Sequence, residues 1–302
     1  MRNRIVGGLV LILSIAIVQC SSKSKNSNNS NSTSDVTAPQ SATLVEEAVS
    51  PAPVRNGKKQ SQVPVTSIAA PGTKAAVSSV EKPIYFQLNQ HIKNQDEDSI
   101  LKEGSAILMK NPNDVKALNA MAMSYYKRGQ YALSKSLLLR AMKVEPGTYE
   151  IQSNMGVVQL ALGDKNEALK SFKKSIELNP NDYVSASNAG SLYVVEQDFE
   201  KASVVLEIAY SKGYRNTKVL SNYAVSLVAT GKYEKADKIY REALKENGND
   251  KGILFNHAIL LIQFLKKNEE GLDIVKKLKF LGVPEESKKK FQDLQTMAER
   301  KS

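Results

Sequence analysis

Four asparagines recur at a fixed interval of 34 residues in the C-terminal two-thirds of the sequence: Asn154, Asn188, Asn222 and Asn256. Asparagine is a mediocre residue inside a helix, because its side chain competes for backbone hydrogen bonds. One side-chain amide can donate to a carbonyl and accept from an N–H, so a row of amides can hold a peptide backbone without reading its side chains. The alternative is that these amides brace neighbouring helices.

The sequence carries no recognisable catalytic motif. The G-x-S-x-G, phosphate-loop and G-x-G-x-x-G patterns are all missing. The only histidines, His91 and His257, fall in core-like slots, so we interpret them as packing residues. A single cysteine, Cys20, excludes a disulfide framework and a cysteine-based metal site within one chain. We therefore expect no catalytic residue, no cofactor and no metal site, and we predict that the chain is not an enzyme.

The asparagines belong to a repeat that is marked by prolines, glycines and small residues. Pro112, Pro146 and Pro180 stand 34 residues apart. A second column consists of Gly129, Gly163 and Gly231, and Gln197 stands where the column would have a glycine between the last two. Two further columns consist of small residues. The first is Ala122, Gly156, Gly190, Ala224 and Ala258, and the second is Ser134, Ala168, Ala202 and Ala236. A fixed period of this length is typical of a solenoid of stacked helix pairs. The small residues are expected where two helices cross closely.

This pattern resembles the tetratricopeptide repeat. The unit 149–182 places Ala168, Phe172, Ser175 and Leu178 on one face of its second helix, and Pro180 stops that helix. The units 115–148 and 217–250 match the family pattern closely, although tryptophan is absent and the unit from Lys251 needs one extra residue to stay in register. The predicted fold is all-α: a right-handed α-solenoid of about six helix pairs over residues 81–284, with a C-terminal capping helix over 285–302 and a disordered tether before it.

The resemblance implies a binding face. In this family the first helices line a concave groove, and the asparagine position faces it, as in the ladder by which some members hold an extended peptide. Apolar residues expected along the same groove are Val157, Leu160, Val194, Val225 and Val228. A basic clamp for a terminal carboxylate, built from Lys116, Lys127 and Lys218, is a second option. The predicted partner is a protein or peptide segment.

The N-terminus has the form of a secretory signal over residues 1–19. Arg2 and Arg4 precede an apolar run over residues 5–18, and Cys20 follows it. This resembles a bacterial lipoprotein precursor, although Gln19 departs from the small residue that the family prefers. The resemblance implies a lipid (palmitate) on Cys20 and an outer-membrane, periplasm-facing protein, with the inner membrane and secretion as alternatives. Residues 20–80 are rich in Ser, Asn, Pro and Ala and predict a disordered linker.

The net charge of +11 gives a basic tilt, but basic and acidic residues are interleaved along the repeats. A nucleic-acid footprint needs basic residues clustered on one face, so no nucleic-acid partner is expected. From this architecture we predict a membrane-anchored, protein-binding scaffold or assembly factor of the bacterial envelope, serving pilus, secretin or motility machinery. The alternative is a scaffold for peptidoglycan or cell-division enzymes.

Overall fold

The computed structural model describes residues 83–283 and 287–299, and these residues form two compact units. The N-terminal body comprises residues 83–232, and the C-terminal body comprises the described residues from 233 onward. The boundary falls inside the predicted unit 217–250, which supplies one helix to each body. The predicted signal peptide, the lipid attachment at Cys20 and the linker 20–80 lie outside the described residues.

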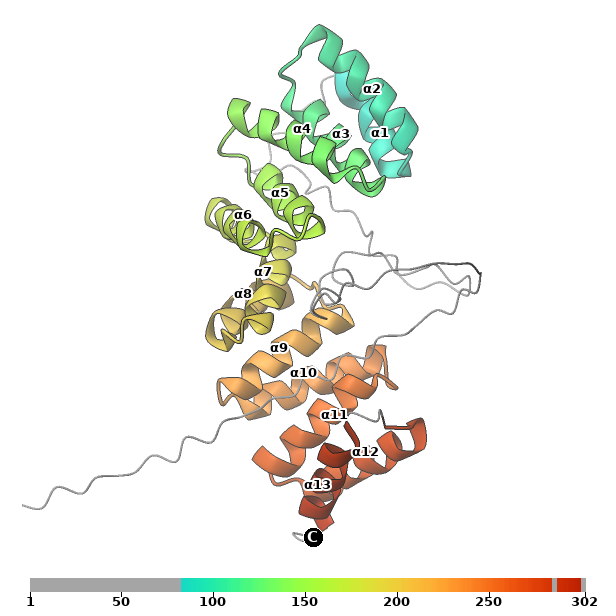
Figure 1. The fold of residues 1–302 in the computed structure, drawn as a ribbon, viewed down its shortest axis with the longest axis vertical. Helices are drawn as coiled ribbons and strands as arrows, with labels where there is room; N and C mark the ends of the chain where they lie inside the picture. The colour runs from blue at the N-terminus through green and yellow to red at the C-terminus, as the bar shows by residue number, and fades with distance from the viewer. Residues whose placement is uncertain (1–82, 284–286, 300–302) are drawn as a thin grey trace, which may run out of the picture. The chain divides into compact units, whose positions relative to one another are not determined.

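The N-terminal body is a succession of antiparallel helix pairs (Figure 1). A short 3₁₀ turn, η2 (Pro83–Tyr85), leads into its nine helices: α1 (Phe86–Asn94), α2 (Glu97–Lys110), α3 (Val115–Lys127), α4 (Tyr131–Val144), α5 (Tyr149–Ala161), α6 (Lys165–Leu178), α7 (Tyr183–Val195), α8 (Phe199–Ser211) and α9 (Thr217–Ala229). Each helix packs on the next in the chain, and the first helices α3, α5, α7 and α9 also contact one another in order.

The C-terminal body contains four α-helices among its described residues: α10 (Tyr233–Glu246), α11 (Lys251–Ile259), α12 (Asn268–Leu281) and α13 (Lys288–Glu299). Its core joins Leu254 and Phe255 of α11 to Val275 and Leu278 of α12. The apolar face of α13 covers this core with the residues Phe291, Leu294 and Ala298. The expected C-terminal capping helix is therefore present.

Local chemistry explains where the helices begin. The side chains of Asp114, Asp182, Asn216 and Asp250 each accept a backbone N–H of the following helix. A side-chain acceptor at this position satisfies a donor that has no partner inside the helix, and it stabilises the helix by about 1 kcal/mol. These four caps fall on a column with the same 34-residue spacing as the prolines.

The first helix of each pair is followed by a residue in the left-handed conformation. The glycines of the predicted column, Gly129, Gly163 and Gly231, have φ angles of 73°, 85° and 75°. The other members of the column are Gln95, Gln197 and Lys266, with φ angles of 56°, 60° and 58°. Glycine is the residue that takes this conformation without steric cost, which explains why it occupies three of these six positions.

The one extra residue of the unit that starts at Lys251 is accommodated in a π-helix. This π-helix, η3 (Leu260–Phe264), continues α11, and the N–H of Leu265 donates to the carbonyl of Leu260. A π-turn adds one residue without breaking the helix. The left-handed residue Lys266 consequently lies 35 residues after Gly231 instead of 34.

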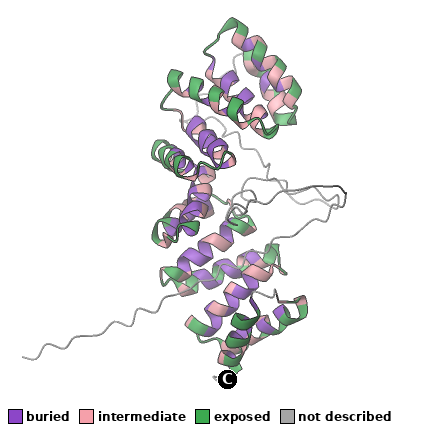
Figure 2. Cartoon of the chain, in the orientation of Figure 1, coloured by how far each residue is buried: buried purple, intermediate pink, exposed green. Residues whose placement is uncertain are grey.

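The small residues lie where helices cross. A Cβ atom added to Gly156 would lie 2.5 Å from Cε1 of Phe172, and one added to Gly190 would lie 2.4 Å from Cγ of Leu206. Ala122, Ala168 and Ala202 are fully buried. Figure 2 shows the consequence: α5 and α7 are mostly buried, whereas the second helices turn an exposed face to solvent. The predicted all-α fold of helix pairs is confirmed.

Among the described residues, the structure holds no helix that is both long enough and apolar enough to cross a membrane.

Candidate functional site

Asn188 of α7 and Asn222 of α9 lie half-buried on neighbouring first helices. The Asn188 amide donates to the carbonyl of Val184 in its own helix at 3.0 Å, and the Asn222 amide donates to Oγ of Ser191 at 3.0 Å. Each amide thus uses one of its two N–H groups. The carbonyl oxygens of both amides accept no hydrogen bond from the described part of the chain. One donor and one acceptor on each side chain therefore stay available to a ligand.

Asn154 of α5 has a different role. Its side chain is only 7% exposed, and its amide donates to Oδ1 of Asn119 in α3 at 2.8 Å. A second hydrogen bond follows at the next interface, where Ser185 of α7 donates to Oγ of Ser153 at 2.9 Å. These two bonds, of which the first is partly buried and the second buried, tie successive first helices together, so at Asn154 the bracing alternative fits the geometry better than ligand binding does.

The remaining predicted groove residues differ in exposure. Asn256 is half-buried on α11, in the C-terminal body. Val157 and Val228 are also half-buried. Leu160, Val194 and Val225 are only 4%, 4% and 5% exposed, because they pack within the helix layers. These last three side chains cannot line a pocket unless the helices rearrange.

Two of the three lysines considered for a carboxylate clamp already have partners at the N-terminal end of the body. Lys127 pairs with Glu97 of α2 at 2.5 Å. The ammonium of Lys116 lies 4.6 Å from the ring centroid of Tyr85. The geometry therefore gives a terminal-carboxylate clamp no support at these two positions.

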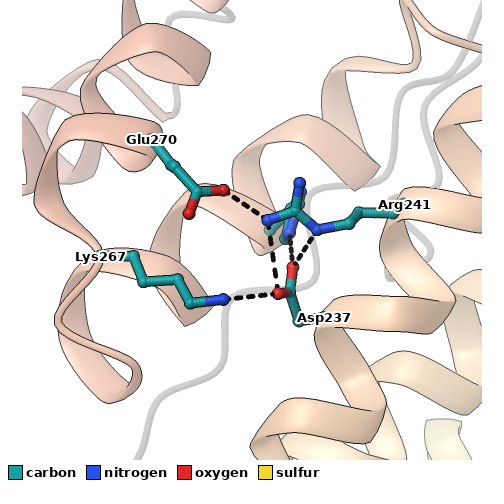
Figure 3. A network of polar contacts seen from close by, with 5 residues as sticks. Asp237, Arg241, Lys267 and Glu270 are labelled. Carbon is teal, nitrogen blue, oxygen red and sulfur yellow. Dashed lines mark hydrogen bonds and ion pairs between the residues drawn. The ribbon is translucent and has the colours of Figure 1, made fainter.

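The C-terminal body contains a polar network that the sequence analysis missed (Figure 3). Asp237 of α10 is 6% exposed. It accepts hydrogen bonds from Nε2 of His257 at 2.6 Å, from Nζ of Lys267 at 3.0 Å and from Nε of Arg241 at 2.9 Å. Arg241 also pairs with Glu270 of α12 at 2.5 Å. The network joins α10, α11 and α12.

Burial and hydrogen bonding act in opposite directions on the two central groups. Burial alone would raise the pKa of Asp237, but the hydrogen bonds from His257, Lys267 and Arg241 bring that pKa below its usual value. Burial lowers the pKa of the His257 imidazole, and the Asp237 carboxylate only partly opposes this. The second ring nitrogen, Nδ1, is buried and has no hydrogen-bond partner.

This histidine–aspartate pair resembles part of a catalytic triad, but its surroundings do not suit catalysis. His257 is 2% exposed, so a substrate has no route to the ring. A general base needs to reach the proton that it removes, and here Nδ1 faces no nucleophilic side chain. The pair is therefore a structural element that holds three helices together.

One sequence signal could have indicated the network. His257 occupies the same repeat position as Met155, Ala189 and Tyr223, three residues that are buried. A histidine in such a column must leave water, and a buried polar ring needs a partner.

Comparison with known proteins identifies the repeat. The tetratricopeptide repeat family is matched over residues 149–182 and again over residues 217–250. These ranges are two of the 34-residue units seen in the sequence, and the first coincides with the α5–α6 pair. The chain contains tetratricopeptide repeats. Proteins built from these repeats are in general scaffolds for protein–protein interaction rather than enzymes.

Curated relatives share only part of their length with this chain. Human tetratricopeptide repeat protein 6 is 28% identical over 116 residues, which are 38% of this chain and 22% of that protein. The Hsp70-Hsp90 organising protein of Plasmodium falciparum is 28% identical over 91 residues, which are 28% of this chain and 16% of that protein. The aligned regions thus span less than a quarter of either relative.

Solved structures share the fold. YrrB, described as a tetratricopeptide repeat protein with an unusual peptide-binding site, superposes with a TM-score of 0.56 at 13% identity and covers 65% of this chain and 97% of its own. MamA from strain AMB-1 superposes with a TM-score of 0.50 at 21% identity, over 57% of this chain and 94% of its own. At these identities the likeness concerns the fold alone.

Proposed function

We propose that this protein is a scaffold that holds an extended polypeptide segment against the first helices α7 and α9. One observation carries the proposal: Asn188 and Asn222 each keep a free donor and a free acceptor on a partly exposed surface. An extended peptide offers alternating N–H and C=O groups, which one side-chain amide can satisfy in pairs. The hydrogen bond between Asn154 and Asn119 fixes the preceding first helix, α5, to α3.

The test separates ligand binding from bracing. The double variant Asn188→Ala/Asn222→Ala should lose partner capture and keep its melting temperature within a few degrees, because the hydrogen bonds that it loses are partly exposed. Asn154→Ala is the matched control, and it should instead lower stability by about 0.5–1.5 kcal/mol, since the hydrogen bond that it removes joins two helices through a side chain that is only 7% exposed. A double variant that melts far lower and still captures its partner would contradict the proposal.

In cells, a photo-crosslinking residue at position 188 or 222 should capture a partner that is not captured from position 204. Val204 on the second helix α8 is 65% exposed and lies on a different helix layer. Capture from both positions at equal yield would indicate a nonspecific surface rather than a binding face.

We further propose that the scaffold is anchored to the bacterial outer membrane through a lipid on Cys20 and faces the periplasm, where it assists assembly of an envelope machine. This part of the proposal is supported by the sequence alone, since Cys20 lies outside the described residues. Pilus, secretin or motility machinery is the first choice, and peptidoglycan or division enzymes are the alternative.

The anchor has its own test. Cys20→Ala should move the protein from the membrane fraction to the soluble fraction, while Ser21→Ala, which keeps the cysteine, should not. Equal membrane retention of the two variants would show that the lipid anchor is wrong, without bearing on the peptide-binding face.

A further inference from the structure

Charge is distributed unevenly between the two helix layers of the N-terminal body. The first helices α5, α7 and α9 are each 13 residues long, and Glu150 and Lys218 are the only charged residues in the three. Both lie in the first turn of their helix, and α7 carries no charge at all. The second helices α4, α6 and α8 carry three, six and three charged residues. Glu150 and Lys218 occupy the repeat position of Val184, so the uncharged part of the face of the first helices is centred on α7, with one charge at its edge on each neighbouring first helix.

The accessible part of this face is a set of side chains at helical spacing. On α7, Val184, Asn188 and Ser191 are half-buried and Val195 is 45% exposed, at steps of four, three and four residues that place them along one stripe. Asn222 of α9 joins this stripe through its hydrogen bond to Ser191, and Val157 is half-buried on the neighbouring first helix α5. We call these six residues the neutral surface.

The neutral surface is also shallow. The larger apolar residues of the same helices, Leu160, Val194 and Val225, are 4–5% exposed and are already used in packing. What remains accessible consists of valines, a serine hydroxyl and amides, with no cavity-forming aromatic side chain among them. A surface of this kind offers backbone hydrogen bonds and small apolar contacts, but no deep pocket for a bulky anchor.

We propose that the neutral surface selects an extended polypeptide segment whose facing residues are uncharged and small, such as Ala, Ser, Thr and Val, and that it discriminates against charged segments. This inference rests on the proposed function. A Lys or Glu side chain pressed against the surface would lose hydration and find no opposite charge along α7, so binding would weaken. Small side chains allow the peptide backbone to approach the amides of Asn188 and Asn222 closely enough for hydrogen bonds.

The probe is a fluorescein-labelled 12-residue peptide of the repeating composition Ser-Ala-Val-Thr, with both ends blocked, and its binding to the full chain is measured by anisotropy. Two matched peptides carry Glu or Lys at two central positions. The neutral peptide should bind at least about tenfold more tightly than either charged one, a difference of about 1.4 kcal/mol.

Charge introduced at the edge of the surface should reverse the preference. Val195→Lys should restore binding of the Glu peptide and Val195→Glu should restore binding of the Lys peptide, because each supplies the missing opposite charge. Val195 makes no side-chain hydrogen bond and is partly exposed, so both variants should fold, which their melting curves would verify. Val204→Lys on α8 is the matched control and should leave all three affinities unchanged.

The outcomes distinguish the two proposals. If charged peptides bind as tightly as the neutral one, and Asn188→Ala/Asn222→Ala abolishes all binding, the selectivity inference is wrong and the proposed function stands. If no peptide binds, or if the double variant binds all peptides normally, the proposed function fails and the inference fails with it.

Discussion

Gln197 holds a left-handed conformation, with φ of 60°, in a slot where Gly163 occupies the preceding repeat. A residue with a Cβ atom pays about 1–2 kcal/mol for this conformation, and glycine does not. Glycine also adds freedom to the unfolded chain, which offsets part of the gain. We therefore expect Gln197→Gly to stabilise the N-terminal body by about 0.5–1 kcal/mol in urea unfolding.

The reciprocal change is the control for this prediction. Gly163→Gln should destabilise the same body by about 1 kcal/mol, because it adds the steric cost at an equivalent turn. If both substitutions changed the free energy of unfolding by the same amount in the same direction, the left-handed φ angle would not be the cause of either change.

His257 gives the C-terminal body a dependence on pH. Its folded pKa lies below the usual 6.5, so the unfolded chain takes up a proton first as the pH falls. Stability is therefore lost as the pH falls through about 6.5 towards the folded pKa. The pKa of Asp237 is also lowered, from 3.8, so its contribution is present above that value and is lost only at lower pH.

Replacing the imidazole by a group that does not titrate should remove this dependence. Glutamine can still donate an N–H to Asp237, so His257→Gln should flatten the stability profile between pH 7.5 and pH 5. Hydrogen exchange of the α11 amides at both pH values measures the effect locally. A profile as steep as that of the parent chain would rule out His257 as its source.

At the scale of single residues, the sequence indicated on which helix a side chain lies better than it indicated which residue that side chain contacts. The asparagine spacing correctly placed Asn188 and Asn222 in successive first helices. It gave no warning that Asn154 would be buried against Asn119, because Asn119 stands one residue off the column. The Asp237 network was also missed, since its members come from three helices whose approach depends on tertiary packing.

At the scale of helices, close crossing is fixed by glycine. A Cβ atom at position 190 would lie 2.4 Å from Cγ of Leu206, so the Leu206 side chain or the α7–α8 pair would have to shift. Gly190→Ala should therefore destabilise the N-terminal body by about 1–3 kcal/mol, as other overpacking substitutions do. Urea unfolding measures this change.

A double-mutant cycle tests whether this particular crossing is responsible. Leu206→Ala removes the obstructing atoms, so Gly190→Ala should cost much less in that background, with a coupling energy of about 1 kcal/mol or more. Gly147→Ala, in a turn with nothing within 4 Å of the added atom, should have little effect. If the changes in stability caused by Gly190→Ala and Leu206→Ala simply add in the double variant, the contact between positions 190 and 206 is not the source of the destabilisation.

The helix boundaries were largely predictable because their signals are local. Asp182 caps α7, Gly163 ends the turn after α5, and the columns of small residues mark the crossings. The extra residue after Lys251 was also visible in the sequence. Its placement in the π-helix η3 was not, because a turn, a loop or a π-helix could each have absorbed it.

At the scale of the whole molecule, a constant period cannot reveal where one compact unit ends. The sequence repeats the same signals through the unit 217–250, yet residues 232 and 233 belong to different bodies. The period reports which residues recur. Compactness depends on the sum of many contacts, which no single motif encodes.

The C-terminal body depends on α13 to cover its last helix pair. Phe291 is 6% exposed and packs in a core with Phe255 of α11 and Val275 of α12. Terminal repeats need such a cover, because the face that would meet a next repeat is otherwise exposed. Phe291→Ala should therefore destabilise the C-terminal body by about 3–5 kcal/mol, and hydrogen exchange should become faster in α11 and α12.

The same experiment tests how far the damage spreads. Each repeat of a solenoid interacts with its neighbours only, so exchange in α5, α6 and α7 should stay unchanged. Lys289→Ala, at an exposed position of α13, controls for substitution in that helix and should leave exchange in α11 and α12 as in the parent chain. Local loss of protection requires that each body have its own stability. If Phe291→Ala instead caused loss of protection throughout both bodies, they would unfold as one cooperative unit.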